Sequence, residues 1–184
     1  MKQLDDISLV TQVAVFHNRK AFDRLVVKYQ SPIRRFFLAQ TGGDVQLSDD
    51  LAQDTFVKAY THITHFRGLS SFSTWLYRIA YNTFYDYMKC RKPTDNIESP
   101  SMLGQKANGV DCGLKLDLQQ ALCILSDKER LCITLQLLEG QAIDKISEIT
   151  GMTEGTVKSH LSRGKQKLTT YLPFHVERPR ALDL

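Results

Sequence analysis

A short stretch near the C-terminal end places two cationic and two hydroxyl side chains close together, at Lys158, Ser159, Ser162 and Arg163. Residues three or four apart lie on the same face of an α-helix. Lysine and arginine neutralise phosphates, and serine and arginine hydrogen-bond to phosphate oxygens or base edges. We therefore interpret this set as a candidate nucleic-acid-binding face. A helical hairpin with a solvated basic face is the alternative.

The residues around this face have the pattern of two helices joined by a tight turn. Apolar residues recur at helical spacing in both helices, at Ile143, Ile146, Ile149, Val157, Leu161 and Leu168. Gly151 lies between the helices, where a turn needs a residue that tolerates a positive φ, and Thr153 can cap the second helix. Ser147 is small, as a close helix crossing requires. Residues 143–167 therefore predict a helix-turn-helix.

A second candidate face combines aromatic, basic and amide side chains on one predicted helix, from about Ser73 to Lys89. The face consists of Trp75, Arg78, Asn82, Tyr85 and Lys89. Aromatic rings stack on unpaired bases, at about 1–3 kcal/mol per base, and cations neutralise phosphates. A neighbouring face is apolar and predicted to point inward, at Phe72, Leu76, Ile79, Ala80, Thr83 and Tyr87. The pattern suits single-stranded or opened DNA, unless the aromatic residues fill a core.

The preceding helix carries an acidic and polar stripe beside its apolar one. We expect this helix to begin at Ser48 as N-cap. The stripe consists of Asp50, Gln53, Asp54 and Val57. Such a stripe is either solvated surface or a docking surface for a basic partner helix, and the residues alone leave both open.

Helical periodicity dominates the chain and predicts an all-α fold. Pro32 interrupts one apolar pattern, so we expect a kink or a helix restart there. A stretch rich in Pro, Ser, Asn and Gly without periodicity predicts a flexible linker. The predicted organisation is two helical domains, 1–92 and 114–172, joined by a linker, 93–113, and followed by an irregular tail, 173–184.

Composition narrows the function classes. The net charge of +4 permits a nucleic-acid partner without requiring one. The five histidines and four cysteines (Cys90, Cys112, Cys123 and Cys132) have no metal-site spacing, and we expect reduced thiols and no metal or cofactor. No phosphate-binding Gly-x-x-x-x-Gly-Lys loop or recognisable catalytic set occurs, so no catalytic residue is predicted. Without a signal peptide or an apolar span, we expect a cytoplasmic protein with no membrane insertion.

Two segments in a fixed order resemble the extracytoplasmic-function (ECF) sigma factors of bacterial RNA polymerase. The N-terminal match reads DLAQDTFVKAY, then FRG, then FSTWLYRIAYN, within residues 50–82. The C-terminal match is residues 125–168, LSDKERLCITLQLLEGQAIDKISEITGMTEGTVKSHLSRGKQKL. The resemblance covers roughly residues 15–92 and 114–170.

The resemblance implies a non-enzymatic initiation factor that binds RNA polymerase core and directs it to promoter DNA. The acidic stripe would dock on the clamp helices of the polymerase's largest subunit. The −10 element would be recognised and opened by Leu69, Ser70, Trp75, Arg78 and Asn82. The C-terminal domain would lie on the flap of the second-largest subunit and read the −35 element through the face described first. Many relatives are held inactive by an anti-sigma factor, which is therefore an expected partner.

Three residues depart from the family pattern. Leu69 replaces a residue that is often polar or acidic, Ser162 is smaller than usual, and Ser147 replaces the usual alanine. The first two leave the −10 and −35 base preferences open.

Other classes compete with this interpretation. The C-terminal pattern also resembles response-regulator output domains, but the N-terminal half has no alternating strands and helices like those of a receiver. A metal-dependent enzyme would need carboxylates near His62 and His65 that the sequence does not place there. A polymerase-binding factor without DNA specificity would not need the recognition helix.

Overall fold

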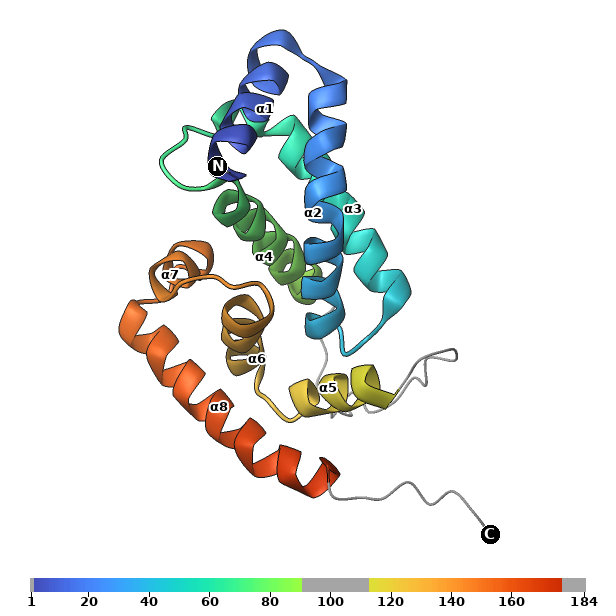
Figure 1. Ribbon diagram of the computed structural model, residues 1–184, viewed down its shortest axis with the longest axis vertical. Coiled ribbons are helices and arrows are strands. Elements are labelled where there is room, and N and C mark those ends of the chain that lie inside the picture. The colour runs from blue at the N-terminus through green and yellow to red at the C-terminus, as the bar shows by residue number, and fades with distance from the viewer. Residues whose placement is uncertain (1, 91–112, 177–184) are drawn as a thin grey trace.

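The structure is a computed structural model that describes residues 2–90 and 113–176, and every regular element within these ranges is helical (Figure 1). The first range holds α1 (Lys2–Phe16), α2 (Arg19–Gln40), α3 (Val45–Thr61), the 3₁₀ turn η1 (Ile63–His65) and α4 (Phe72–Cys90). The second holds α5 (Gly113–Cys123), α6 (Asp127–Ile133), the π-helical turn η2 (Thr134–Leu138), α7 (Ile143–Thr150) and α8 (Glu154–Val176). The all-α prediction with two domains is confirmed. The predicted linker lies outside the described residues except for Gly113, which begins α5.

The N-terminal domain is a bundle in which α2, α3 and α4 share one core. Leu25, Ile33, Phe36 and Leu76 are at most 1% exposed. Because α2 buries apolar residues on both sides of Pro32, it continues through the proline as one helix. Of the two predicted alternatives, a kink or a helix restart, the restart is therefore absent, since burial on both sides outweighs one lost backbone hydrogen bond.

Two elements of this domain differ from the sequence-based expectation. Helix α1, for which the sequence gives no clear helical pattern, packs on the bundle through Leu9, Val10 and Val13. Helix α3 begins three residues before Ser48, because the Asp44 side chain accepts the cap hydrogen bond from the Leu47 N–H at 3.0 Å. Ser48 is instead buried and donates to the Asp44 carbonyl.

The predicted helix-turn-helix is present as α7 and α8. Gly151 ends α7 at φ +73, and its N–H bonds to the Ser147 carbonyl at 2.9 Å. The Ser147 hydroxyl donates to the Met152 carbonyl at 2.6 Å, so the small side chain fastens the turn. Val157 and Leu161 are buried under α8. Helix α8 continues to Val176, so the first four residues of the expected irregular tail are helical.

We expect Gly151→Ala to destabilise the protein by about 1–2 kcal/mol, because an alanine Cβ is strained at positive φ. Gly155→Ala is the matched control, since Gly155 has an ordinary helical φ and open space around a built Cβ. Alanine should be neutral or stabilising there by up to about 1 kcal/mol. Denaturant unfolding of both variants measures the difference, and equal effects would contradict the role given to Gly151.

Helix α8 crosses α6 at close range through Gly164. A Cβ built on this buried glycine would lie 2.8 Å from the Ile133 Cγ1 and 3.6 Å from the Glu129 Cβ. The first distance is shorter than a carbon–carbon contact allows. Gly164 therefore sets how closely the recognition helix packs on the helix beneath it.

A buried carboxylate also links these two helices. Glu129 is 4% exposed and accepts from the Lys167 Nζ at 2.8 Å and from the Ser126 N–H at 3.0 Å. The Lys167 hydrogen bond, aided by the one from Ser126 and opposed by burial, lowers the pKa of Glu129 to about 2. Lys167 therefore neutralises a buried carboxylate in addition to adding positive charge to α8.

The depressed pKa predicts an acid-sensitive contribution to stability. Glu129 should stabilise the fold above pH 4.5, its ordinary pKa, and lose this effect as the pH falls toward about 2. Glu129→Gln should therefore be less stable than the parent at pH 7, with the gap closing between these two values. Denaturant unfolding across pH measures this. Glu148→Gln, which removes an exposed carboxylate of α7, is the control, and a pH-independent gap for Glu129→Gln would contradict the linkage.

Candidate nucleic-acid and protein interfaces

All four residues predicted to contact the −35 element lie exposed along α8. Lys158, Ser159, Ser162 and Arg163 lie opposite the buried side chains of Val157 and Leu161. Their spacing on one helix gives a continuous surface with two cations and two hydroxyls. Such a surface can donate to phosphates and to base acceptors in a major groove.

Neighbouring side chains orient the two cations of this face. The Lys158 Nζ lies 3.5 Å from a carboxylate oxygen of Glu154, one turn earlier. The Arg163 guanidinium donates to the Ser159 carbonyl at 3.3 Å and lies 3.4 Å from the His160 Nδ1. Burial, and then the charges of Arg163 and Lys128, lower the pKa of His160. The lowered pKa favours the neutral imidazole, whose Nδ1 can then accept from Arg163.

The predicted −10 residues lie in the loop before α4 and along α4 itself. Leu69 is 89% exposed, directly after Gly68 at φ +71, and Ser70 is half-buried. The loop ends where the Ser71 hydroxyl accepts from the Thr74 N–H at 3.1 Å and caps α4. An apolar side chain with this exposure is free to contact a base or a partner.

Trp75 is half-buried, so its side chain is partly packed against the core and partly open to a ligand. Its ring lies 5.5 Å from that of Phe66 and 5.7 Å from that of Phe72, measured between centroids. Arg78 and Asn82 follow at three- and four-residue steps and are exposed. The structure therefore brings one anchored ring, one cation and one amide to the same side of α4.

The C-terminal end of α4 continues this aromatic and basic character. The rings of Tyr81 and Tyr85 stack with centroids 6.2 Å apart, and the Lys89 Nζ lies 4.6 Å from the centroid of Tyr85. Tyr85 and Lys89 are exposed, in agreement with the predicted face. Tyr81, which is not part of the predicted face, is half-buried.

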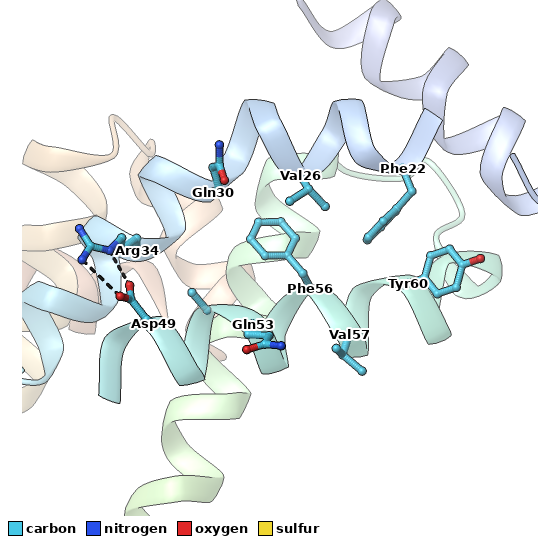
Figure 2. Close-up of a pocket in the computed structure, with 10 residues that line it drawn as sticks. Phe22, Val26, Gln30, Arg34, Asp49, Gln53, Phe56, Val57 and Tyr60 are labelled. Atoms are coloured by element: carbon cyan, nitrogen blue, oxygen red, sulfur yellow. Dashed lines mark hydrogen bonds and ion pairs between the residues drawn. The ribbon is translucent and has the colours of Figure 1, made fainter. Parts of the chain in front are cut away.

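The acidic stripe of α3 borders an apolar groove between α2 and α3. Gln53 and Val57 line the groove, which has a volume of about 480 Å³, whereas Asp50 and Asp54 are exposed on α3 outside its lining (Figure 2). Val57 is 56% exposed although it is apolar. A single exposed apolar side chain is common on protein surfaces, so it is the apolar groove beside the acidic residues that offers space for a partner.

The second wall of this groove comes from α2 and was not identified from the sequence. Phe22 and Val26 face α3 across the groove, which Gln30 also lines, and the Phe22 and Tyr60 rings meet edge to face at 4.9 Å (Figure 2). The Arg34 guanidinium pairs with the Asp49 carboxylate at 2.5 and 3.3 Å at one end. The first two wall residues belong to an ordinary helical stripe, which carries no signal that they border a groove.

Metal ligands, membrane-spanning helices and reactive thiols are the other features of the described residues that bear on function. Residues 2–90 and 113–176 contain no group of three His, Cys, Asp or Glu side chains that could hold a metal ion. In the same ranges, no helix is long and apolar enough to cross a membrane. Cys90 and Cys123 are exposed free thiols, and burial raises the pKa of the Cys132 thiol to about 11. Cys112 lies outside the described residues.

Comparisons with known proteins match both halves of the chain. Residues 25–94 match sigma-70 region 2, and residues 115–168 match sigma-70 region 4. The chain is 34% identical to the ECF RNA polymerase sigma-E factor of Escherichia coli K12, over 91% of this chain and 94% of the relative. It is 33% identical to the sigma-E factor of Haemophilus influenzae, over 91% and 95%.

Two solved structures share the architecture over nearly their whole length. The sigma factor RpoE of Bartonella quintana, in complex with the anti-sigma factor NepR, aligns with a TM-score of 0.68 and 28% identity, covering 86% of this chain and 99% of that one. CnrH, in complex with the cytosolic domain of CnrY, aligns with a TM-score of 0.70 and 24% identity, covering 92% and 98%. The CnrH alignment supports the fold alone.

Proposed function

Since the chain belongs to the extracytoplasmic-function family of RNA polymerase sigma factors, we propose a specific division of labour among its surfaces. The protein is an alternative sigma factor, not an enzyme, and directs promoter-specific transcription initiation by RNA polymerase. The region 2 match excludes an ordinary response-regulator output protein. What remains to be assigned is which residues bind which partner.

Helix α8 reads the −35 element through Lys158, Ser159, Ser162 and Arg163. The exposure of all four residues on one helix supports this assignment. A 23-residue helix with one cationic face fits a major groove. The same domain binds the flap of the second-largest polymerase subunit.

Helix α4 and the loop before it recognise and open the −10 element. Leu69 and Ser70 contact bases from the loop, and Trp75, Arg78 and Asn82 contact the opened strand. The support is the exposure of Leu69 and the anchoring of Trp75 by two phenylalanines, which holds an aromatic platform rigid before DNA binds.

The groove between α2 and α3 docks on the clamp helices of the largest polymerase subunit. Gln53 and Val57 contact these helices inside the groove, and Asp50 and Asp54 attract their basic side chains from its border. The single observation that carries this assignment is the apolar groove beside an acidic stripe. Two weak DNA contacts then act together because both domains sit on one polymerase.

The chain also binds an anti-sigma factor and acts in the cytoplasm. The anti-sigma partner is supported by the RpoE–NepR complex, whose sigma factor aligns over 86% of this chain at 28% identity. The cytoplasmic location follows from the function, because RNA polymerase and promoter DNA are located there.

Run-off transcription tests the function directly. Purified core polymerase is incubated with genomic DNA fragments with and without the protein, and the 5′ ends of the RNA are sequenced. We expect start sites that appear only with the protein and share spaced −35 and −10 sequences. If the protein neither binds core nor creates start sites, the proposed polymerase and DNA surfaces are wrong.

A further inference from the structure

A buried carboxylate joins the two domains. Glu139 lies directly after η2 in the C-terminal domain, and its side chain is 2% exposed. It accepts two hydrogen bonds from the Arg35 guanidinium, at 2.7 and 2.9 Å, and one from the Tyr77 hydroxyl at 2.6 Å. Both donors belong to the N-terminal domain, on α2 and α4. We call this set of three residues the interdomain clasp.

A second set of contacts lies at the end of α2. The Gln40 side-chain amide donates to the Thr134 hydroxyl at 3.2 Å, and both residues are buried. The Arg130 guanidinium donates to the Gln40 carbonyl at 3.4 Å. Beside them, Gln119 of α5 packs so closely against Gly43 that a Cβ there would lie 2.4 Å from its Oε1. Several sequence-distant groups therefore fix one arrangement of the two domains, in which the α7 end of the C-terminal domain lies beside α4 (Figure 1).

We call this arrangement, with the two domains in contact, the closed arrangement. In it the buried carboxylate of Glu139 has hydrogen-bond donors for both of its oxygens. A buried carboxylate is costly without donors, and Glu139 has three. Burial, and then the Glu139 charge, raise the pKa of Tyr77, so its hydroxyl stays protonated and donates. The Glu139 hydrogen bond raises the pKa of Arg35, which stays cationic. Opening the domains would return Glu139 to water, where these specific contacts are lost.

The two domains of the closed arrangement lie too close together to reach the −10 and −35 elements at the same time. The −10 and −35 elements are separated by about 25 base pairs, or roughly 85 Å of duplex at ~3.4 Å per pair. A compact body of the described size has a radius of gyration of about 15 Å and hence a diameter of about 40 Å. The 22 residues between α4 and α5 can span at most about 75 Å. Binding both elements at once therefore requires the domains to separate, and the extended connecting chain together with the widths of the two domains covers this distance.

We propose that the interdomain clasp holds the free chain in a closed, promoter-incompetent state, and that core polymerase binds the open state. The inference rests on the proposed function of the two DNA-reading faces. The interaction surface is thus a face of region 2 around Arg35 and Tyr77, and its partner is the chain's own region 4. Polymerase affinity is reduced by the fraction of chain that is closed, so weakening the clasp strengthens core binding.

Glu139→Gln tests the clasp with little change in shape, because it keeps one acceptor and removes the charge. We expect a larger radius of gyration of the free chain in small-angle X-ray scattering and about tenfold tighter binding to core polymerase. Glu148→Gln is the control, since it removes an exposed carboxylate of the same domain. Tyr77→Phe should shift both readouts in the same direction by less. Unchanged scattering and unchanged core affinity for Glu139→Gln would overturn the proposal.

A reversible disulfide cross-link tests the effect of locking the two domains together, instead of weakening their contact. A Cβ built on Gly42 lies 3.9 Å from the Sγ of Cys123, across the domain boundary. Gly42→Cys, in a chain with Cys90→Ser and Cys112→Ser, is oxidised with diamide to join it to Cys123. We expect at least a tenfold loss of start-site formation, restored by dithiothreitol. Gly42→Ser in the same background controls for strain at this glycine.

The outcomes separate this inference from the function on which it rests. If the oxidised chain initiates as well as the reduced one, the closed state is competent and the proposal is wrong. If the reduced chain and the parent both fail to create start sites, the proposed function itself fails.

Discussion

Replacing Lys158 and Arg163 together with alanine is expected to reduce transcription from −35-dependent promoters by about 100-fold or more. Each good contact to a base is worth about 1–3 kcal/mol of discrimination, and each lost phosphate contact weakens binding further. Both side chains project from α8 and neither supports the core. The loss should therefore appear without a loss of stability and without a change in core polymerase affinity.

Promoter-specific run-off transcription and core binding, measured on the same preparations, check this expectation. The matched control is Arg19→Ala with Lys20→Ala, which removes the same charge from exposed positions at the start of α2. If the control loses as much activity, the effect is one of net charge. Unchanged promoter-specific transcription in the Lys158 and Arg163 variant would remove that face from −35 recognition.

Introducing a charge into the groove of the N-terminal domain should strongly weaken polymerase binding. Val57→Asp places a carboxylate in the apolar groove between α2 and α3, where it must be desolvated against a partner helix. We expect core affinity to fall by about 100-fold, the scale of a central interface residue. Because Val57 is 56% exposed, the isolated protein should keep its stability.

Val27→Asp is a close control for this substitution. Val27 is the same residue type, 68% exposed, on the neighbouring helix, and does not line the groove. Affinity titration of both variants with core polymerase, alongside thermal unfolding, distinguishes docking from folding. Equal affinity for the Val57 and Val27 variants would place the polymerase contact elsewhere.

The recognition helix was predictable because its signals are local. Gly151, the flanking isoleucines and the serine and lysine spacing fall within 25 residues, and the structure places each as the pattern indicates. Helix boundaries were less certain, since Asp44 and Ser48 are both good N-caps and only the geometry of the turn selects Asp44. The residues expected to contact DNA and polymerase lie exposed, but their contacts remain predictions.

The interdomain clasp and the second groove wall could not be predicted from the sequence. Glu139 follows a helix without a distinctive pattern, and its partners are 104 and 62 residues away. Phe22 belongs to an apolar stripe typical of any core helix, and only the position of Tyr60 makes it part of a groove. Long-range pairing of this kind depends on how the helices pack, which periodicity along one helix does not encode.

The glycine at the crossing of α8 and α6 limits how promoter choice can be redesigned or can diverge. The exposed side chains at Lys158, Ser159, Ser162 and Arg163 can change without altering the core, whereas a Cβ at Gly164 would lie 2.8 Å from the Ile133 Cγ1 and would force the two helices apart. A transplanted recognition segment from a relative should therefore retarget the protein only if it carries glycine at this position. The exposed side of α8 can therefore be changed to alter promoter specificity, whereas the side that packs on α6 must keep its glycine.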